Sequence, residues 1–253
     1  CWASLFTPRA IYYREKNHFS HFKVGLAAVV QRMVESEYSG VMFTIDPVSN
    51  DKTKIVVESI LGLGELIVQG AVTPDHFEID KNKLVITSKI IGQQEKKMVK
   101  SDTENKIIKI SPSLQKKQKL VDKIILEIAK LGREIEKHYF FPQDIEWAYE
   151  KGKIYIVQSR PVTTTKTTIN SKQLTEEKNE IGNLKEILVG HPASPGIGIG
   201  PVKIIYSAKE INKIKKGDIL VTAMTNPDFV PAMKKAAAIV TDEGGRTAHA
   251  AIV

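Results

Sequence analysis

Apolar residues recur at spacings of three and four along one long stretch of the chain. This period matches the turn of an α-helix and predicts a helix over residues 112–139. Pro112 suits the first turn of such a helix, and Ser111 or Ser113 can cap its N-terminus. The lysines of this stretch are expected on its solvated face. The apolar stripe consists of Leu120, Ile124, Ile128, Leu131 and Ile135.

Shorter stretches are rich in β-branched residues and predict strands. Single strands are expected at residues 24–31, 40–45 and 54–58. Two further stretches alternate polar and apolar positions on both sides of a short polar turn, which is typical of hairpins. These hairpins pair residues 75–80 with 83–87 and residues 144–148 with 153–158. Residues 9–19 mix apolar and charged positions and are compatible with a helix.

A polar tract separates two differently patterned parts of the chain. Residues 163–180 contain almost no large apolar side chains and predict a linker. The part that follows is rich in glycine, and its apolar runs predict further strands. These strands are expected at residues 201–205, 218–221 and 238–241. The pattern therefore predicts two domains of mixed α+β or α/β class.

The composition narrows the classes of partner. The chain has 253 residues, of which 42% are hydrophobic and 26% charged, as in an ordinary globular protein. Its formal net charge of +8 comes from lysines that do not form a continuous stripe with interleaved aromatic residues. Nucleic acid is therefore not the expected partner, whereas an anionic phosphate ligand fits the charge.

The cysteine content and the two ends of the sequence predict where the protein is found. The single cysteine, Cys1, excludes an internal disulfide and fits a reducing cytoplasm. No apolar run reaches the roughly 18 residues of a membrane helix, and the first residues do not form a signal peptide. The missing initiator Met and the apolar last residues, 250–253, predict a fragment of a longer chain.

The last ten residues combine a glycine turn with a candidate helix start. Two glycines follow the strand predicted at residues 238–241, and Thr247 is a suitable N-cap. His249 would then lie in the first helical turn, where unpaired N–H groups and the helix dipole favour an anion. Imidazole is a competent nucleophile near neutral pH, and Arg246 can bind a phosphoryl group. This combination favours a His249 that carries a phosphoryl group over one that only packs.

The hairpin predicted at residues 144–158 carries a second set of polar residues. If its strands pair, Asp144, Glu146 and Gln158 can face one way together with Arg160. Carboxylate and amide oxygens suit Mg²⁺, and arginine suits phosphate. The same alternation also describes any half-exposed hairpin, so the spacing alone favours the plain structural interpretation.

Two further segments are weaker candidates for a nucleotide site. Residues 29–34 form a predicted strand that leads into a polar stretch, and such an edge can offer adenine its backbone hydrogen bonds. Residues 61–65 form a glycine turn that can approach phosphates, but they lack the rest of a phosphate-loop motif.

Together these segments resemble the phosphoenolpyruvate synthase family. Residues 1–166 are similar to the later part of its ATP-grasp domain, and residues 187–253 to most of its phosphohistidine domain, with residues 167–186 as the linker. The first resemblance rests on residues 1–7, 30–34, 39–46, 62–65, 69–75, 144–148 and 156–161. The second rests on residues 193–196, 224–228, 238–247 and 249–252.

The resemblance implies a fold and a reaction. A partial ATP-grasp domain would be followed by a small swivelling phosphohistidine domain. ATP would bind with Mg²⁺, and His249 would take its β-phosphoryl group, giving AMP and phosphate. The phosphoryl group would then pass to pyruvate at a separate C-terminal barrel, which makes phosphoenolpyruvate. The resemblance also allows a homo-oligomer of the full-length enzyme.

The resemblance also assigns roles to single residues. Glu146 and Gln158 correspond to ligands of the metal and the phosphates, and Arg160 to a phosphate contact. Thr247 corresponds to a threonine that regulatory kinases modify. Residue 248 is Ala where relatives often have Cys or Ser. Gln31, Met33 and Val34 correspond to the strand edge that binds the nucleotide.

Other functions share much of this pattern. Pyruvate phosphate dikinase and rifampicin phosphotransferase have the same architecture, and a non-catalytic nucleotide-binding or phosphocarrier module is a third alternative. The resemblance implies that the first half of the ATP-grasp domain and the pyruvate barrel are missing here. The isolated chain is therefore expected to make no phosphoenolpyruvate and to phosphorylate His249 poorly.

Overall fold

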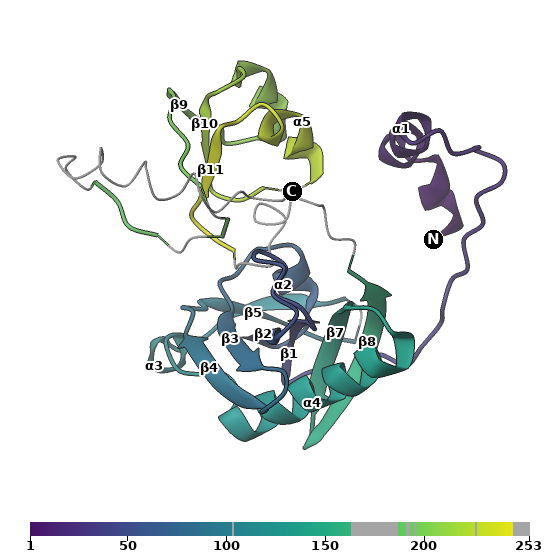
Figure 1. Cartoon of the computed structure of the whole chain (residues 1–253), viewed down its shortest axis with the longest axis vertical. Helices are drawn as coiled ribbons and strands as arrows, with labels where there is room; N and C mark the ends of the chain where they lie inside the picture. Colours follow the sequence, from purple (N-terminus) through teal and green to yellow (C-terminus); the bar gives the residue numbers. More distant parts are fainter. Residues whose placement is uncertain (103, 163–186, 191–192, 195, 226, 245–253) are drawn as a thin grey trace. The chain divides into compact units, whose positions relative to one another are not determined.

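The computed structural model describes residues 1–102, 104–162, 187–190, 193–194, 196–225 and 227–244 (Figure 1). The chain divides into two compact units, Cys1–Met33 and Val34–Val253. The predicted linker at residues 163–180 and the helix start near Thr247 lie outside the described residues.

The first unit contains the short 3-10 helix η1 (Trp2–Phe6) and the helix α1 (Pro8–Lys16). The Thr7 hydroxyl accepts a hydrogen bond from the Ala10 N–H and caps α1. The helix predicted at residues 9–19 therefore exists but ends earlier. His18 has a φ of 57°, which an α-helix cannot contain.

The strand predicted at residues 24–31 is wrong. Residues 24–36 form neither helix nor strand, and the side chains of Val29 and Val30 are 84% and 97% exposed. A β-branched run becomes a strand when it packs and pairs with neighbours. In the described parts of the chain, no strand pairs with this run.

A six-stranded antiparallel sheet forms the centre of the second unit, in the order β4-β3-β2-β1-β7-β8 (Figure 1). The single strands predicted at residues 40–45 and 54–58 are confirmed as β1 and β2, and both predicted hairpins form. The strands are β1 (Tyr38–Phe43), β2 (Lys54–Leu61), β3 (Asp75–Asp80), β4 (Val85–Ile90), β7 (Gln143–Glu150) and β8 (Lys153–Pro161).

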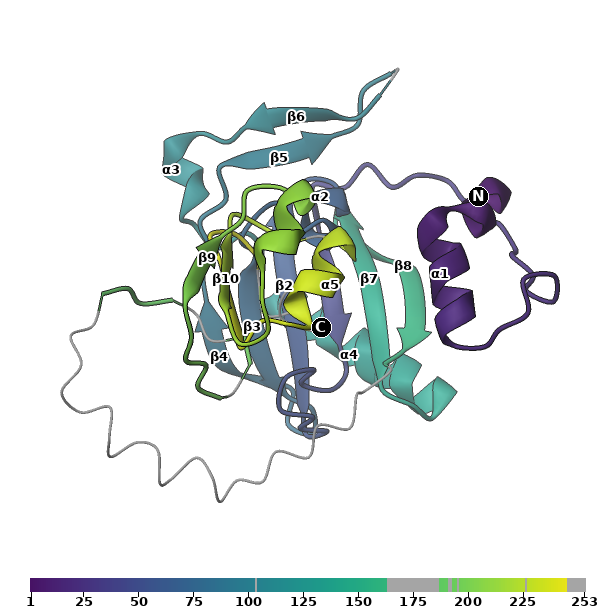
Figure 2. The ribbon, with the colours of Figure 1, turned by 90° about the horizontal axis from the view of Figure 1, so that it is seen from above.

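Helix α4 (Asp122–Tyr139) covers one face of this sheet (Figures 1 and 2). Gly132 lets the helix approach β1 closely, because a Cβ at this position would lie 2.5 Å from the Met42 sulfur. Alternate strand residues and the buried stripe of α4 form one continuous apolar core. Its fully enclosed members are Met42, Ile55, Val57, Phe77, Ile79, Leu120, Ile125, Ile128, Ala129, Ile145 and Trp147.

The long helix predicted at residues 112–139 is interrupted. It consists of α3 (Pro112–Gln115) and α4, and Ser111 makes no capping hydrogen bond through its side chain. Between them, Lys119 donates from its backbone N–H to Asp75 Oδ2 at 2.7 Å and from Nζ to Asp75 Oδ1 at 2.8 Å. Both side chains are fully buried. This ion pair ties the connection to β3, so α4 begins only after Val121.

A second cluster covers the opposite face of the sheet. It includes α2 (Glu65–Val68) and Met98 of the strand β5 (Lys96–Val99). β5 pairs with β6 (Lys106–Lys109) in a separate two-stranded sheet, which the sequence pattern did not predict. Short strands in a lysine-rich segment give little periodic signal.

The described residues after 186 form a smaller parallel sheet in the order β11-β10-β9. All three predicted strands are confirmed, as β9 (Val202–Ile204), β10 (Ile219–Thr222) and β11 (Ala238–Thr241). Short helices cover one face: η3 (Ala208–Lys213), η4 (Pro227–Phe229) and α5 (Val230–Met233). The predicted mixed α/β class is correct, with parallel pairing in this sheet alone among the described parts.

Candidate functional site

The hairpin of β7 and β8 brings four of the predicted polar residues together. Asp144 lies directly opposite Arg160, and Glu146 lies directly opposite Gln158. Residues opposite each other on antiparallel strands share a face of the sheet, as do residues two apart on one strand. All four side chains therefore belong to one face. Ile145 and Trp147 alternate with them and enter the core beneath α4.

Asp144 and Arg160 form an ion pair across the two strands. Asp144 Oδ2 accepts from Arg160 Nε at 2.8 Å and lies 2.7 Å from the terminal guanidinium nitrogen. The Asp144 side chain is mostly buried, whereas 68% of the Arg160 side chain is exposed. The carboxylate thus holds the guanidinium at the sheet surface, and exposed N–H groups remain available for an anion.

Glu146 lies in an unfavourable environment for a charge. Burial raises the pKa of Glu146, the neighbouring Asp144 carboxylate raises it further, and Arg160 opposes both effects. Desolvation and a like charge both disfavour the ionised carboxylate. A ligand that brings positive charge to Glu146 would relieve this penalty.

A β-bulge on β8 sets which way the polar residues face. Trp147 pairs with Ile156 and Glu146 pairs with Gln158, so β8 has one more residue, Val157, than β7 has between these two pairs. Without a bulge, strict alternation would put Ile156 and Gln158 on the same face. With it, Ile156 lies opposite a core residue and Gln158 opposite Glu146.

This bulge was missed by the sequence analysis, although a signal for it is present. Within the strand predicted at residues 153–158, Ile154 and Ile156 are apolar and Gln158 is polar, and all three have even numbers. A strand whose residues two apart change from apolar to polar must either change face or contain an extra residue.

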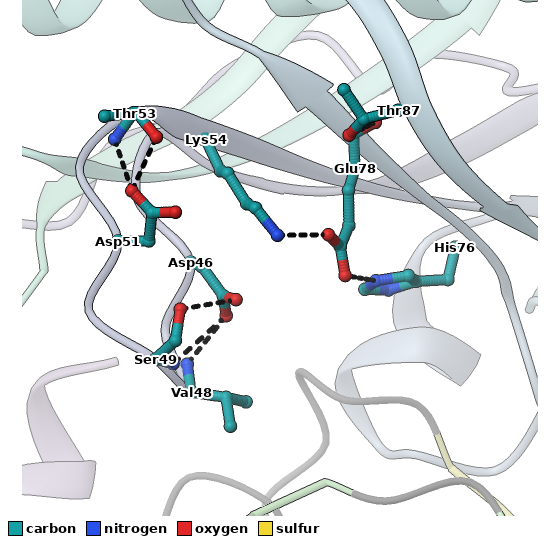
Figure 3. Close-up of polar contacts among 9 residues, drawn as sticks. All are labelled: Asp46, Val48, Ser49, Asp51, Thr53, Lys54, His76, Glu78 and Thr87. Carbon is teal, nitrogen blue, oxygen red and sulfur yellow. Dashed lines mark hydrogen bonds and ion pairs between the residues drawn. The ribbon is translucent and has the colours of Figure 1, made fainter. Parts of the chain in front are cut away.

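A second group of charged residues on the same face was also missed. Glu58 of β2 lies opposite Val41, which in turn lies opposite Glu146. The Glu58 carboxylate is 3.1 Å from His76 Nδ1, and both side chains are buried. His76 Nε2 makes no hydrogen bond and lies 3.8 Å from Glu78, which binds Lys54 Nζ at 2.6 Å (Figure 3).

The loop before β2 is acidic but satisfies its own charges. Asp46 accepts from the Val48 N–H at 2.9 Å and from the Ser49 hydroxyl at 2.7 Å (Figure 3). Asp51 accepts from the backbone and hydroxyl of Thr53. These carboxylates stabilise a turn and are poor candidates for a ligand site.

The glycine turn at residues 61–65 is rigidly held. Gly62 has a φ of 86°, and a Cβ there would lie 2.3 Å from the Met98 carbonyl oxygen. The buried Ser39 hydroxyl donates to Gly62 O at 2.6 Å. The side-chain amide of the buried Gln94 accepts from the Leu61 N–H and donates to the Leu61 carbonyl. The turn is therefore preformed beside the polar face of the sheet.

The remaining predicted site residues belong to other parts of the chain. Gln31 and Met33 lie in the first unit, and Val34 begins the second. All three belong to an irregular segment, so the strand predicted at residues 29–34 is absent. Arg246, Thr247 and His249 lie outside the described residues.

Glu146 and Gln158 together could bind a magnesium ion whose remaining coordination positions are filled by water and phosphate oxygens. A carboxylate and an amide oxygen face each other across the strands, with a second carboxylate next to them. Within the described ranges, no three His, Cys, Asp or Glu side chains form a full metal cage. Mg²⁺ commonly takes one or two carboxylates and substrate phosphates, so the small donor set is compatible.

Comparison with known proteins extends these observations. Residues 1–181 match the family described as pyruvate phosphate dikinase, AMP/ATP-binding domain. The chain belongs to this family. Residues 214–253 match a second family, described as PEP-utilising enzyme, mobile domain. The family membership confirms the resemblance on which the ATP-grasp prediction was based.

Individual relatives agree with this placement. The chain is 54% identical to the "Probable phosphoenolpyruvate synthase" of Pyrococcus abyssi, and all of it aligns with 31% of that protein. It is 53% identical to the phosphoenolpyruvate synthase of Pyrococcus furiosus, over 32% of that protein's length. The chain thus spans about a third of the curated relatives it matches. No helix in the described parts is long and apolar enough to cross a membrane.

Proposed function

We propose that this chain is the nucleotide-binding and phosphohistidine-bearing part of a phosphoenolpyruvate synthase. The overall reaction would convert ATP, pyruvate and water to AMP, phosphoenolpyruvate and phosphate. The observation that carries the proposal is the group of Asp144, Glu146, Gln158 and Arg160 on one face of the sheet in an ATP-binding family. Its acidic, amide and guanidinium groups together suit a metal-bound polyphosphate.

In this proposal, the hairpin binds the phosphates of ATP. Glu146 and Gln158 would hold Mg²⁺, which neutralises phosphate charge when it is bound. Arg160, held by Asp144, would donate hydrogen bonds to phosphate oxygens. The nucleotide edge is assigned to Gln31, Met33 and Val34. This part of the proposal rests on the resemblance of residues 30–34 rather than on geometry.

His249 is the proposed phosphoryl carrier. One of its imidazole nitrogens would attack the β-phosphorus of ATP and break the bond to the bridging oxygen, which leaves with AMP. Water would then remove the γ-phosphate as inorganic phosphate. The remaining phosphoryl group would pass from His249 to the enolate oxygen of pyruvate, elsewhere in the full-length protein. Arg246 would support the phosphoryl group, and Thr247 is the proposed site of regulatory phosphorylation.

The proposed nucleotide-binding and phosphoryl-carrying roles are assigned to separate parts of the chain. Residues 1–166 would form the later part of the ATP-grasp domain, residues 167–186 the linker, and residues 187–253 the phosphohistidine domain. The cytoplasmic location follows from the same proposal.

A labelling experiment on the full-length polypeptide tests the proposal. ATP labelled in the β-phosphate should transfer an acid-labile, base-stable label to the protein, and His249→Ala should abolish it. His138→Ala, at the exposed end of α4, is the matched control and should keep the label. Persistent label in His249→Ala would refute the assignment.

The second product separates the two nearest enzyme functions. A synthase releases inorganic phosphate, whereas a dikinase transfers the γ-phosphoryl group to added phosphate and releases pyrophosphate. Pyruvate-dependent AMP formation without added phosphate is the expected result. An absolute requirement for phosphate, with pyrophosphate as the product, would indicate the dikinase.

A further inference from the structure

The two-stranded sheet of β5 and β6 is a preformed arm on the second unit (Figure 2). Met98 of β5 is buried in the cluster on the polar side of the main sheet, and its carbonyl accepts from the Leu63 N–H at 2.9 Å. The Ile110 N–H, just after β6, donates to Glu95 O at 2.8 Å. The arm is therefore anchored at its base, and its shape does not depend on a partner.

The outer strand of the arm has an open edge. In the part of the chain that the structure describes, β6 pairs with β5 alone, so its other edge presents unpaired backbone N–H and C=O groups. All four residues of β6 are exposed, and the side chains of Ile107 and Ile108 are 57% and 41% exposed. An open edge with apolar side chains is a template for another strand.

The arm and the short segment after it, up to residue 117, together carry much of the net positive charge of the protein. Residues 95–117 contain seven lysines and three acidic residues, a net of +4 out of +8 for the whole chain. Among the described residues, Lys100 alone of these seven lysines has an ion pair, with Glu35. The sequence analysis missed this concentration because these lysines do not form one continuous run.

Lysines occupy both ends of β6, and one of them faces another lysine. Lys109 lies directly opposite Lys96, and Lys106 lies opposite Val99. Like charges directly opposite each other destabilise a strand pair. Edge lysines can discourage aggregation, but that role does not require a lysine on the neighbouring strand. The uncompensated pair indicates a negatively charged partner.

We propose that the open edge of β6 binds an extended acidic protein segment by strand addition. Backbone hydrogen bonds would supply affinity, and side-chain positions would supply selectivity. In an antiparallel arrangement, carboxylates of the partner lie opposite Lys106 and Lys109, and two apolar side chains lie beside Ile107 and Ile108. The partner therefore has the pattern acidic-apolar-apolar-acidic.

Synthetic peptides test the proposal on the full-length polypeptide. The probe is a ten-residue peptide with Glu-Val-Val-Glu at its centre, and the first control replaces both Glu with Lys. A second control keeps the charges but carries N-methyl groups on both valines, which blocks strand pairing. Fluorescence anisotropy gives the affinities, and hydrogen exchange reports the amides of residues 106–109.

The acidic peptide should bind at least tenfold more tightly than either control and should protect the β6 amides. The Lys106→Glu/Lys109→Glu variant should reverse the preference in favour of the lysine peptide. The Lys83→Glu/Lys123→Glu variant has the same change in net charge and should keep the original preference. Equal binding of the acidic and N-methylated peptides, or no binding of any, would overturn the proposal.

Discussion

The two faces of the six-stranded sheet differ in what their buried side chains do. The face beneath α4 is apolar from Phe77 across to Trp147. The opposite face has buried or half-buried charges in the same strands, including Glu58, His76 and Glu146. Alternation along a strand lets one segment serve both purposes. Substitution of an apolar residue on the first face should therefore change stability, and substitution of a charged residue on the second face should change ligand binding.

The largest effect is expected at the buried ion pair that borders the apolar face. Asp75→Ala would leave the Lys119 ammonium buried without its carboxylate, at a cost of about 3–5 kcal/mol. Urea denaturation of the chain measures the loss. Asp75→Ala/Lys119→Met removes both charges and should recover much of it. If the double variant is as unstable as the single one, the cost comes from lost packing and not from the unpaired charge.

A smaller but still large effect is expected in the apolar core. Ile128→Ala removes a fully buried side chain of α4 and should lower the free energy of unfolding by about 2–5 kcal/mol. Lys130→Ala, on the exposed side of the same helix, is the control and should change it little. Nucleotide affinity of the folded Ile128→Ala protein should stay unchanged. A large loss of affinity would contradict the separation of a stabilising face from a ligand-binding face.

Glu146→Gln should have the opposite profile. It should weaken binding of Mg²⁺-ATP by at least tenfold in the full-length polypeptide, as measured by calorimetry, and should not destabilise the fold. The same test on Glu150→Gln, at the far end of β7, is the control. Unchanged affinity in Glu146→Gln would refute the proposed metal ligand.

The stability of this variant should also depend on pH. Because the pKa of Glu146 is raised in the folded state, stability falls as pH rises from the usual glutamate pKa through the raised value. Glutamine has no such charge, so the stability advantage of Glu146→Gln should grow across that range. Denaturation between pH 4 and pH 8 measures it, and a constant difference would contradict the raised pKa.

The smallest effect on stability is expected at the surface ion pair. Asp144→Asn loses the charge that holds Arg160, but the guanidinium is largely exposed, so the cost should be within about 1 kcal/mol. Nucleotide affinity should fall more visibly, because Arg160 is no longer oriented. A loss of stability comparable to that of Ile128→Ala would show that this face also carries the fold.

The local sequence pattern predicted most strands of the six-stranded sheet but not the segments that connect to it or precede it. The β3 and β7–β8 segments were predictable because their alternation reflects one buried and one polar face. The interruption before α4 was not, because it depends on Lys119 meeting Asp75, which is distant in sequence. The strand prediction for residues 24–31 failed for the converse reason, because no strand in the described part of the chain pairs with this segment.

The candidate site was predicted in part. The spacing of Asp144, Glu146, Gln158 and Arg160 predicted a shared face, which the register of β7 and β8 confirms. Their roles came from the resemblance and stay predictions. The charged group around His76 could not be predicted, because it is assembled from β2 and β3 by pairing across the sheet.

The bulge at Val157 has a consequence for how this hairpin can vary among related proteins. A deletion within a regular strand turns every following side chain to the other surface. Loss of Val157, in contrast, would restore unbroken pairing and leave Gln158 and Arg160 where they are. Natural variants one residue shorter at this position should therefore keep the side chains equivalent to Gln158 and Arg160 on the ligand-binding face. An alignment gap there would not be a sign of lost function.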